Sequence, residues 1–190
     1  MTIRLAVLTI LIYASAGFHA QSRAADFADG FEQLLATEPA NLSGITAQHD
    51  SVRSGVVTAP ALLPLTWSAS LAATAQAWAN QCVDVVAPIG FIDHNPGRST
   101  GHPYYVGENT FASSGSVYSP SQVVSYWASE AQNYNYAANS CSGVCGHYTQ
   151  IVWRTTAFVG CARSDCPALT YRHTVVCNYG PGGNTGGRPY

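Results

Sequence analysis

Apolar residues recur every three or four positions along the middle of the chain, which is the spacing of one face of a helix. Residues 45–56 fit a helix that ends near Gly55. Residues 63–82 contain a second helix, for which Ser68 is the candidate N-cap. Four residues share the apolar face of this second helix and should pack inward: Leu71, Ala75, Trp78 and Cys82.

A third predicted helix carries a carboxylate on its apolar face. It begins at Ser119-Pro120, because a serine cap followed by proline is a typical helix start, and it extends through residue 134. Glu130 falls within the apolar stripe formed by Val123, Trp127 and Tyr134. A carboxylate that faces a core is costly unless it is paired. Either the helix end frays and Glu130 bends to solvent, or Glu130 faces a pocket and meets a cation, a histidine or a metal.

The last part of the chain has the pattern of strands. Short apolar runs at residues 148–153, 158–163 and 171–179 have the length and composition of strands. Gly, Pro and Asn dominate residues 94–109, which are predicted to form a loop, and residues 136–146 are predicted to form a polar loop with two cysteines. Helices first and strands last, with little alternation, favour an α+β layered domain with an antiparallel sheet.

A short apolar run near the N-terminus has the pattern of a secretory signal peptide. It follows Arg4 and leads to Ala14-Ser15-Ala16, a small-residue cleavage site. We assign residues 1–20 to the signal peptide, with cleavage between 16 and 24, and residues 21–44 to a lead-in that is helical over 27–36. An uncleaved anchor is the alternative, but the run is shorter than the roughly 20 residues of a membrane span. No other apolar stretch is long enough to cross a bilayer, so we expect a secreted, extracellular protein without a transmembrane segment in its mature form.

Six cysteines follow the predicted signal peptide. An even number of cysteines in an exported chain favours three disulfides. Cys141 and Cys145 have the spacing of half a zinc site, which is the alternative, but no Cys-His partner pair lies at a matching spacing. Spacing alone does not choose among the connectivities.

Charged residues are scarce: Asp, Glu, Lys and Arg make up 9% of the chain, against about 25% in an ordinary soluble protein. All the basic residues are arginine, the formal net charge is −2, and no basic stripe is present, which argues against a nucleic-acid binder. The scarcity leaves few candidate partners for Glu130, namely His94, Glu108 and His147. Taken singly, each has an ordinary explanation: a solvated loop histidine, a glutamate in a turn, and a strand that happens to begin with a polar residue.

Four motifs together resemble the CAP superfamily of cysteine-rich secretory proteins, antigen 5 and plant pathogenesis-related proteins of group 1. They are "HNPGR" (94–98), "GEN" (107–109), "GHYTQIVWRTT" from Gly146 and "VVCNYGPGGN" (175–184). The resemblance extends from about Ile45 to Tyr190. Small departures are Thr110 after "GEN" and Thr185 after the last motif, and neither touches a charged residue of the site.

The resemblance implies a CAP domain over residues 45–190, folded as a three-layer α-β-α sandwich with a central antiparallel sheet. It also implies one large cleft lined by two histidines and two acids, and it implies three disulfides. The cleft residues would be His94, Glu108, Glu130 and His147, and the pairs Cys82–Cys166, Cys161–Cys177 and Cys141–Cys145.

By this resemblance we expect a secreted binding protein of the defence type, monomeric, rather than an enzyme. Two neutral imidazoles suit Zn²⁺ or another divalent cation, with the glutamates as ligands or as partners that orient the histidines. A small apolar ligand, a sterol or a fatty acid, would bind beside the loop at 133–145, where Tyr134 and Tyr136 would flank an apolar pocket. Plain surface packing is the alternative for these two tyrosines.

Two enzymatic alternatives use the same residues. In a metal-dependent protease or esterase, Glu108 or Glu130 would take a proton from metal-bound water, but the sequence has no His-Glu-x-x-His motif. A thiol enzyme built on Cys145 and His147 would lose its nucleophile to a disulfide. A serine hydrolase of the Gly-x-Ser-x-Gly type has no matching turn.

Overall fold

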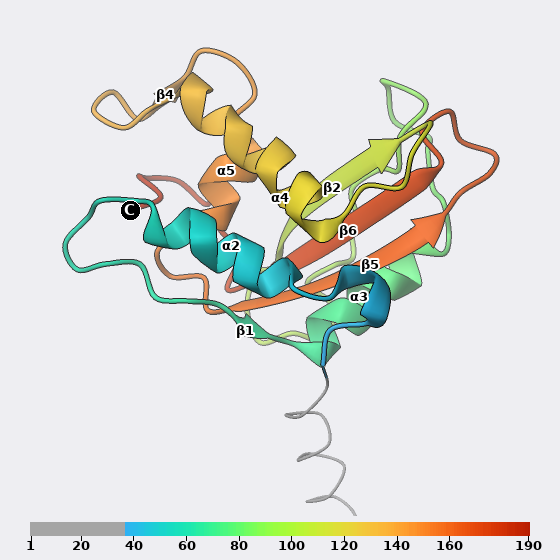
Figure 1. Ribbon diagram of the computed structural model, residues 1–190, viewed down its shortest axis with the longest axis horizontal. Helices are drawn as coiled ribbons and strands as arrows, with labels where there is room; N and C mark the ends of the chain where they lie inside the picture. The colour runs from blue at the N-terminus through green and yellow to red at the C-terminus, as the bar shows by residue number, and fades with distance from the viewer. Residues whose placement is uncertain (1–36) are drawn as a thin grey trace, which may run out of the picture. The chain divides into compact units, whose positions relative to one another are not determined.

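Figure 1 shows the protein as a computed structural model, which describes residues 37–190. The predicted signal peptide, the predicted helix at 27–36 and the start of the lead-in lie outside the described residues. The helices are η1 (Ala40–Leu42), α2 (Ile45–Ser54), α3 (Ala69–Ala79), α4 (Pro120–Ala128), η2 (Ser129–Asn133) and α5 (Gly146–Ile151), where η marks a 3-10 helix. The strands are β1 (Thr66–Trp67), β2 (Gly107–Ser113), β3 (Tyr134–Asn135), β4 (Ser140–Cys141), β5 (Phe158–Asp165) and β6 (His173–Gly180).

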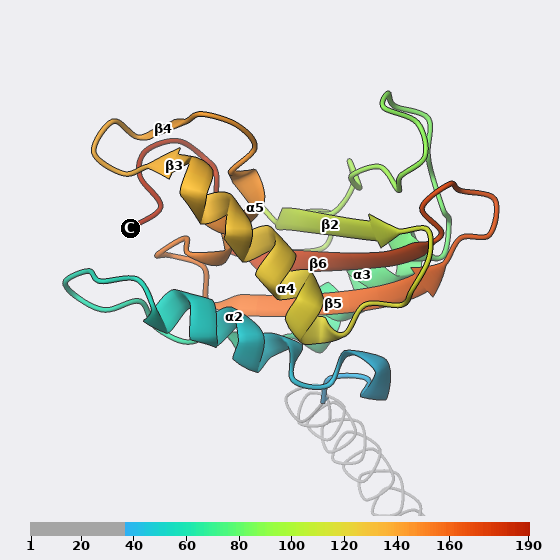
Figure 2. The ribbon, with the colours of Figure 1, turned by 45° about the horizontal axis from the view of Figure 1, so that its top comes forward.

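The centre of the fold is a four-stranded sheet in the order β1-β5-β6-β2. Strands β2 and β5 both pair antiparallel with β6, while the short β1 runs parallel to β5. Helix α3 covers one face, and α2, α4 and α5 cover the other (Figures 1 and 2). The predicted three-layer α-β-α sandwich is confirmed, except that one short parallel pair makes the sheet mixed.

The predicted helix starts are confirmed by their caps. The Ser68 side chain accepts a hydrogen bond from the Leu71 N–H at 3.3 Å, and Ser119 forms a reciprocal capping box with Gln122. The third helix is shorter than predicted, because α4 ends at Ala128 and the chain continues as η2. The Ser129 hydroxyl donates to the Tyr126 carbonyl at 2.7 Å, a local bond that competes with regular helix geometry.

Two predictions of secondary structure are wrong. Residues 148–153 were predicted as a strand, but residues 146–151 form helix α5; a short apolar run fits either structure. The predicted loop at 94–109 ends early, since β2 begins at Gly107 and pairs with β6 along its whole length. A Cβ on Gly107 would collide with the side-chain carbonyl of Gln150, so a larger residue here would require that buried amide to move.

The three predicted disulfides are present. Cys82–Cys166 links the segment after α3 to the residue after β5, Cys161–Cys177 crosses from β5 to β6, and Cys141–Cys145 closes the loop before α5. No cysteine of residues 37–190 is free. Cys141 and Cys145 therefore do not form half of a zinc site, and Cys145 cannot act as a thiol nucleophile.

Arg53 ties α2 to the segment that follows α5. Its side chain is 1% exposed and donates hydrogen bonds to the carbonyls of Leu63 at 2.7 Å, Ile151 at 2.8 Å and Trp153 at 2.9 Å. Carbonyl groups at a helix end lack partners within the helix. A buried guanidinium thus satisfies the end of α5 and fixes this short helix against α2.

Candidate functional site

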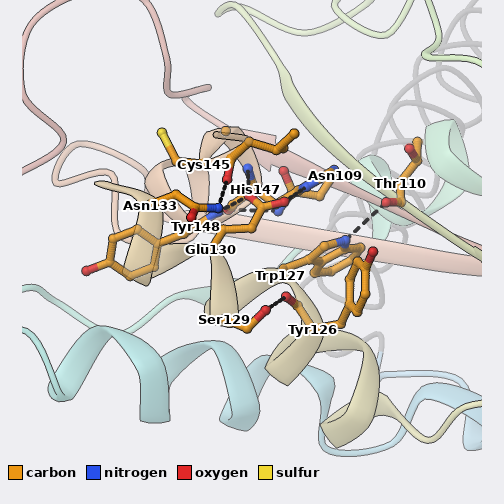
Figure 3. A network of polar contacts seen from close by, with 12 residues as sticks. Asn109, Thr110, Tyr126, Trp127, Ser129, Glu130, Asn133, Cys145, His147 and Tyr148 are labelled. Carbon is orange, nitrogen blue, oxygen red and sulfur yellow. Dashed lines mark hydrogen bonds and ion pairs between the residues drawn. The ribbon is translucent and has the colours of Figure 1, made fainter. Parts of the chain in front are cut away.

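The first part of the site is a pair formed by Glu130 and His147 (Figure 3). The imidazole Nδ1 lies 2.6 Å from Oε1 of the carboxylate. The other oxygen, Oε2, accepts the backbone N–H groups of His147 at 2.9 Å and Tyr148 at 3.3 Å. These N–H groups belong to the first turn of α5 and would otherwise lack partners. Glu130 therefore orients the histidine and caps the helix that carries it.

Glu130 is buried although the α-helix ends before it. The residue is 8% exposed, so the alternative of a frayed end that bends to solvent is wrong. Burial raises the pKa of the Glu130 carboxyl. The hydrogen bond and charge of His147, together with the backbone N–H groups of His147 and Tyr148, outweigh this effect and leave the pKa below its usual value. The carboxylate is thus ionised at neutral pH.

The second part of the site is a pair formed by His94 and Glu108. The imidazole Nδ1 lies 2.8 Å from Oε1 of Glu108, and the Asn95 N–H donates to the same oxygen at 2.9 Å. The Glu108 side chain is fully buried, whereas that of His94 is 56% exposed. The structure therefore joins the four predicted residues as two similar pairs, each with a histidine that rests on an inner carboxylate.

The two pairs are joined through adjacent residues of β2. Glu108 holds His94, and its neighbour Asn109 donates from Nδ2 to the backbone carbonyl of His147 at 3.1 Å. Successive side chains of a strand point to opposite faces. The side chains of Glu108 and Asn109 therefore face opposite sides of the sheet, and both contacts lie close to the start of the edge strand β2.

A buried polar network, which the sequence analysis missed, runs from Asn109 into the core. Asn109 also donates to the Tyr179 hydroxyl at 3.1 Å, and this hydroxyl bonds to Nε2 of His49 at 2.8 Å. Nδ1 of His49 donates to the Ile45 carbonyl at 2.8 Å. Burial lowers the pKa of His49 from 6.5 to about 4, so this imidazole is neutral. The buried face of α2 carries Ile45, His49 and Arg53 at helical spacing. This spacing could have indicated from the sequence that His49 is buried.

The tyrosines of the predicted lipid loop lie beside a hollow of about 560 Å³. Tyr134 is partly buried, and its hydroxyl donates to Oδ1 of Asn139 at 2.9 Å. Tyr136 is 43% exposed and stacks on Tyr190 with ring centroids 4.8 Å apart. Most of the other residues around the hollow are polar, namely Gln132, Asn133, Asn135, Ser140 and Ser142.

A larger groove of about 610 Å³ follows β2 and the turn after it. Residues 110–116 form one long side, and His147 lies on its wall. The groove therefore brings one of the predicted histidines into contact with an otherwise apolar and hydroxylic surface.

The donor atoms of the two pairs suit a divalent cation. In each pair the carboxylate engages Nδ1, which leaves Nε2 available as a metal ligand, and this is the usual arrangement behind metal-bound histidines. Within residues 37–190, however, no three side chains of His, Cys, Asp or Glu come close enough together to hold an ion. An ion at this site would need water molecules for part of its coordination shell. His173 and Asp165 form a third such pair, at 2.6 Å, on the surface between β5 and β6.

No helix in the described part of the chain has the length and apolar character that crossing a membrane requires.

A family model and several similar known proteins place the chain in the same family. The model of the "Cysteine-rich secretory protein family", CAP, matches residues 46–179. The chain is 44% identical to "Pathogenesis-related protein PR-1" of Medicago truncatula over 132 residues, which are 68% of this chain and 69% of that protein. It is 36% identical to human "GLIPR1-like protein 1" over 162 residues, 80% of this chain and 63% of that protein. The chain spans between 53% and 65% of the length of three such mammalian relatives.

Solved structures agree with this fold. The venom allergen-like protein 4 of Schistosoma mansoni superposes with a TM-score of 0.65 at 28% identity, over 80% of this chain and 94% of that one. The structure of NaASP2 with Zn²⁺ superposes with a TM-score of 0.52 at 25% identity, over 81% of this chain and 90% of that one.

Proposed function

Because the chain belongs to the cysteine-rich secretory protein (CAP) family, we propose that it is an extracellular binding protein of the defence type that holds a divalent cation, such as Zn²⁺, at its two histidine–carboxylate pairs. Relatives named as pathogenesis-related proteins support the defence role. The three disulfides support an oxidising, extracellular location.

One observation carries the cation proposal. His94 and His147 both direct Nδ1 to a carboxylate, which fixes the tautomer and raises the basicity of Nε2 as a ligand. The structure of NaASP2 contains Zn²⁺ in a related fold. In this proposal His94 and His147 bind the ion, Glu108 and Glu130 orient them, and water completes the shell.

Calorimetric titration of the purified protein with Zn²⁺ tests this proposal. The wild type should bind the ion, and the double variant His94→Ala/His147→Ala should bind it at least about tenfold more weakly. His173→Ala is the matched control, because His173 has the same carboxylate contact but lies outside the site. Equal binding by the wild type and the double variant would remove the cation site from these pairs.

A sterol or a fatty acid is the second proposed ligand. The rings of Tyr134 and Tyr136 beside the hollow along residues 132–142 favour it, because aromatic rings supply apolar contact area, while most of the other residues around the hollow are polar. Radiolabelled cholesterol and palmitate should bind the wild type saturably at micromolar protein and bind Tyr136→Ser more weakly, while His94→Ala should bind normally. Absence of saturable uptake would reject this ligand class.

A metal-dependent hydrolase remains the alternative use of the same site. The low pKa of Glu130 argues against this residue as a general base, since an efficient base has a pKa near the working pH. This leaves Glu108 as the other candidate base, and its side chain is fully buried. We expect the Zn²⁺-loaded protein to cleave neither a peptide library nor an ester library. Cleavage that disappears in His147→Ala would replace the binding proposal with the hydrolase.

A further inference from the structure

The outer edge of strand β2 carries unpaired backbone groups, and the pairing of its neighbours identifies them. β2 lies at one end of the sheet. Cys161 and Cys177 oppose each other on β5 and β6 with Cα atoms 4.0 Å apart, the short spacing of a non-hydrogen-bonded antiparallel pair. The backbone N–H and C=O of Cys177 therefore point away from β5, toward β2.

The alternation then continues into β2. Asn109, which opposes Cys177, exchanges hydrogen bonds with β6, so the residues on either side of it direct their N–H and C=O groups outward. Thr110 agrees with this assignment, because its carbonyl accepts the Trp127 indole N–H at 3.0 Å from outside the sheet (Figure 3). Within residues 37–190, no hydrogen bond reaches the outward N–H of Thr110 or the outward N–H and C=O of Ala112.

The groove of about 610 Å³ lies along this unpaired edge, since consecutive residues from 110 to 116 line it. Phe111, Tyr118 and Tyr126 form an aromatic cluster that contributes to its wall, with ring centroids 5.1 and 5.4 Å apart. Phe91 and Tyr171, stacked at 4.4 Å, contribute as well. No Asp, Glu, Lys or Arg lines the groove.

We propose that the groove binds an extended, uncharged peptide segment of a partner protein, which adds to the sheet as a strand beside β2. A surface made of consecutive backbone groups is matched best by another backbone, which is the principle of strand addition. The aromatic walls receive apolar side chains at alternate positions of the peptide, and a charged side chain would lose its hydration without gaining a partner. The Trp127 indole already occupies the Thr110 carbonyl, so the open edge runs from Phe111 to Ser113. At roughly 3.3 Å per residue it is about 10 Å long and accommodates about three peptide residues.

This peptide site goes beyond the cation site and uses different groups. It depends on backbone groups of β2 and on aromatic walls, whereas the cation proposal depends on imidazole nitrogens. The two share only His147, which lines the groove. Binding measured in the presence of EDTA therefore tests the peptide site alone, and its failure leaves the cation proposal untouched.

The experiment selects ligands from a displayed library of random hexapeptides on the immobilised protein in EDTA. Enriched sequences should carry few charges and should have apolar residues at alternate positions. Synthetic versions should bind Ala112→Pro at least about tenfold more weakly than the wild type, because proline removes the outward N–H without breaking the pairing of β2 with β6. Ala112→Val, which adds bulk but keeps the N–H, is the matched control and should bind more tightly than Ala112→Pro.

A second measurement needs no protein variant. Methylation of successive backbone nitrogens of an enriched peptide should abolish binding at every second position only, because alternate N–H groups face β2. No enrichment of hexapeptides, equal binding to Ala112→Pro and Ala112→Val, or equal tolerance of methylation at all positions would each overturn the proposal.

Discussion

The side chain of Asn109 donates a hydrogen bond to the backbone carbonyl of His147 at 3.1 Å. Asn109 belongs to the edge strand β2 and is 1% exposed, while His147 lies in the first turn of α5. This bond and the Glu130 carboxylate hold the same histidine from two directions. The position of the imidazole thus depends on the sheet as well as on the segment after α4.

Asn109→Ala should lower the free energy of unfolding by about 1–3 kcal/mol, because the His147 carbonyl and the Tyr179 hydroxyl lose a buried donor. Urea denaturation at pH 7 measures this effect. Asn135→Ala is the control, because Asn135 lies at the exposed end of β3 and its side chain accepts only the Ala138 N–H; it should cost less than about 1 kcal/mol. An unchanged urea midpoint for Asn109→Ala would mean that the bond contributes nothing to stability.

The stability of the wild type should fall by about 2 kcal/mol between pH 7 and pH 5 on account of His49. Its pKa is about 4 in the folded protein against 6.5 in the unfolded chain, so the unfolded chain binds the extra proton in this range. A histidine whose pKa is lowered in the folded protein favours the folded state most above about pH 6.5. This contribution to stability is lost as the pH falls toward 4. Urea denaturation of the wild type and His49→Gln at both values measures the difference, which should be smaller in the variant. Parallel losses in both proteins would contradict the assignment to His49.

Glu130→Gln should destabilise the protein by about 1–3 kcal/mol at pH 7, because the amide cannot accept all the hydrogen bonds that the carboxylate accepts. The pKa of Glu130 is lowered in the folded protein, so the stabilisation is present above the unfolded pKa near 4.5 and is lost as the pH falls through the folded value. The two proteins should therefore approach each other in stability below pH 4.5. A constant difference from pH 7 to pH 3 would show that the charge of Glu130 is irrelevant to folding.

Arg53→Met should cost about 3 kcal/mol or more, since the carbonyls of Leu63, Ile151 and Trp153 lose their donor in the interior. Thermal and urea unfolding measure the loss. Arg154→Met removes hydrogen bonds to Thr58 and Pro60 near the surface and should cost less than about 1 kcal/mol. Similar losses in the two variants would indicate that burial does not increase the contribution of the Arg53 hydrogen bonds to the free energy of unfolding.

The spacing of apolar residues was enough to predict that Glu130 is buried, but it did not predict most other residues of the site. The burial of Glu130 could be predicted because this residue still faces the core, although it lies in a 3-10 helix rather than in the predicted α-helix. His94, Glu108 and the disulfide pairs depended on resemblance, since their partners lie far away in the sequence. The pairing of His94 with Glu108 is a contact between a loop and a strand, and no periodicity predicts such a contact.

The two errors in secondary structure have the same origin. β2 contains Gly, Glu, Asn and Ser, which do not favour strands, and it forms because β6 supplies a partner along its full length. Helix α5 forms from an apolar run because a carboxylate from outside the helix satisfies its first N–H groups. In both cases a distant group decides the local structure.

The hydrogen bonds from Asn109 to Tyr179, to His49 and to the Ile45 carbonyl can run in one direction only. A backbone carbonyl never donates, so His49 must carry its proton on Nδ1, and Tyr179 must turn its hydroxyl hydrogen to Nε2 and present a lone pair to Asn109. All the hydrogen bonds of this series therefore point in the same direction, and no single bond can exchange its donor and acceptor unless the others do so as well. The variant Tyr179→Phe would therefore leave two buried polar groups without a hydrogen-bond partner, because the one missing oxygen bonds both to the Asn109 amide and to Nε2 of His49.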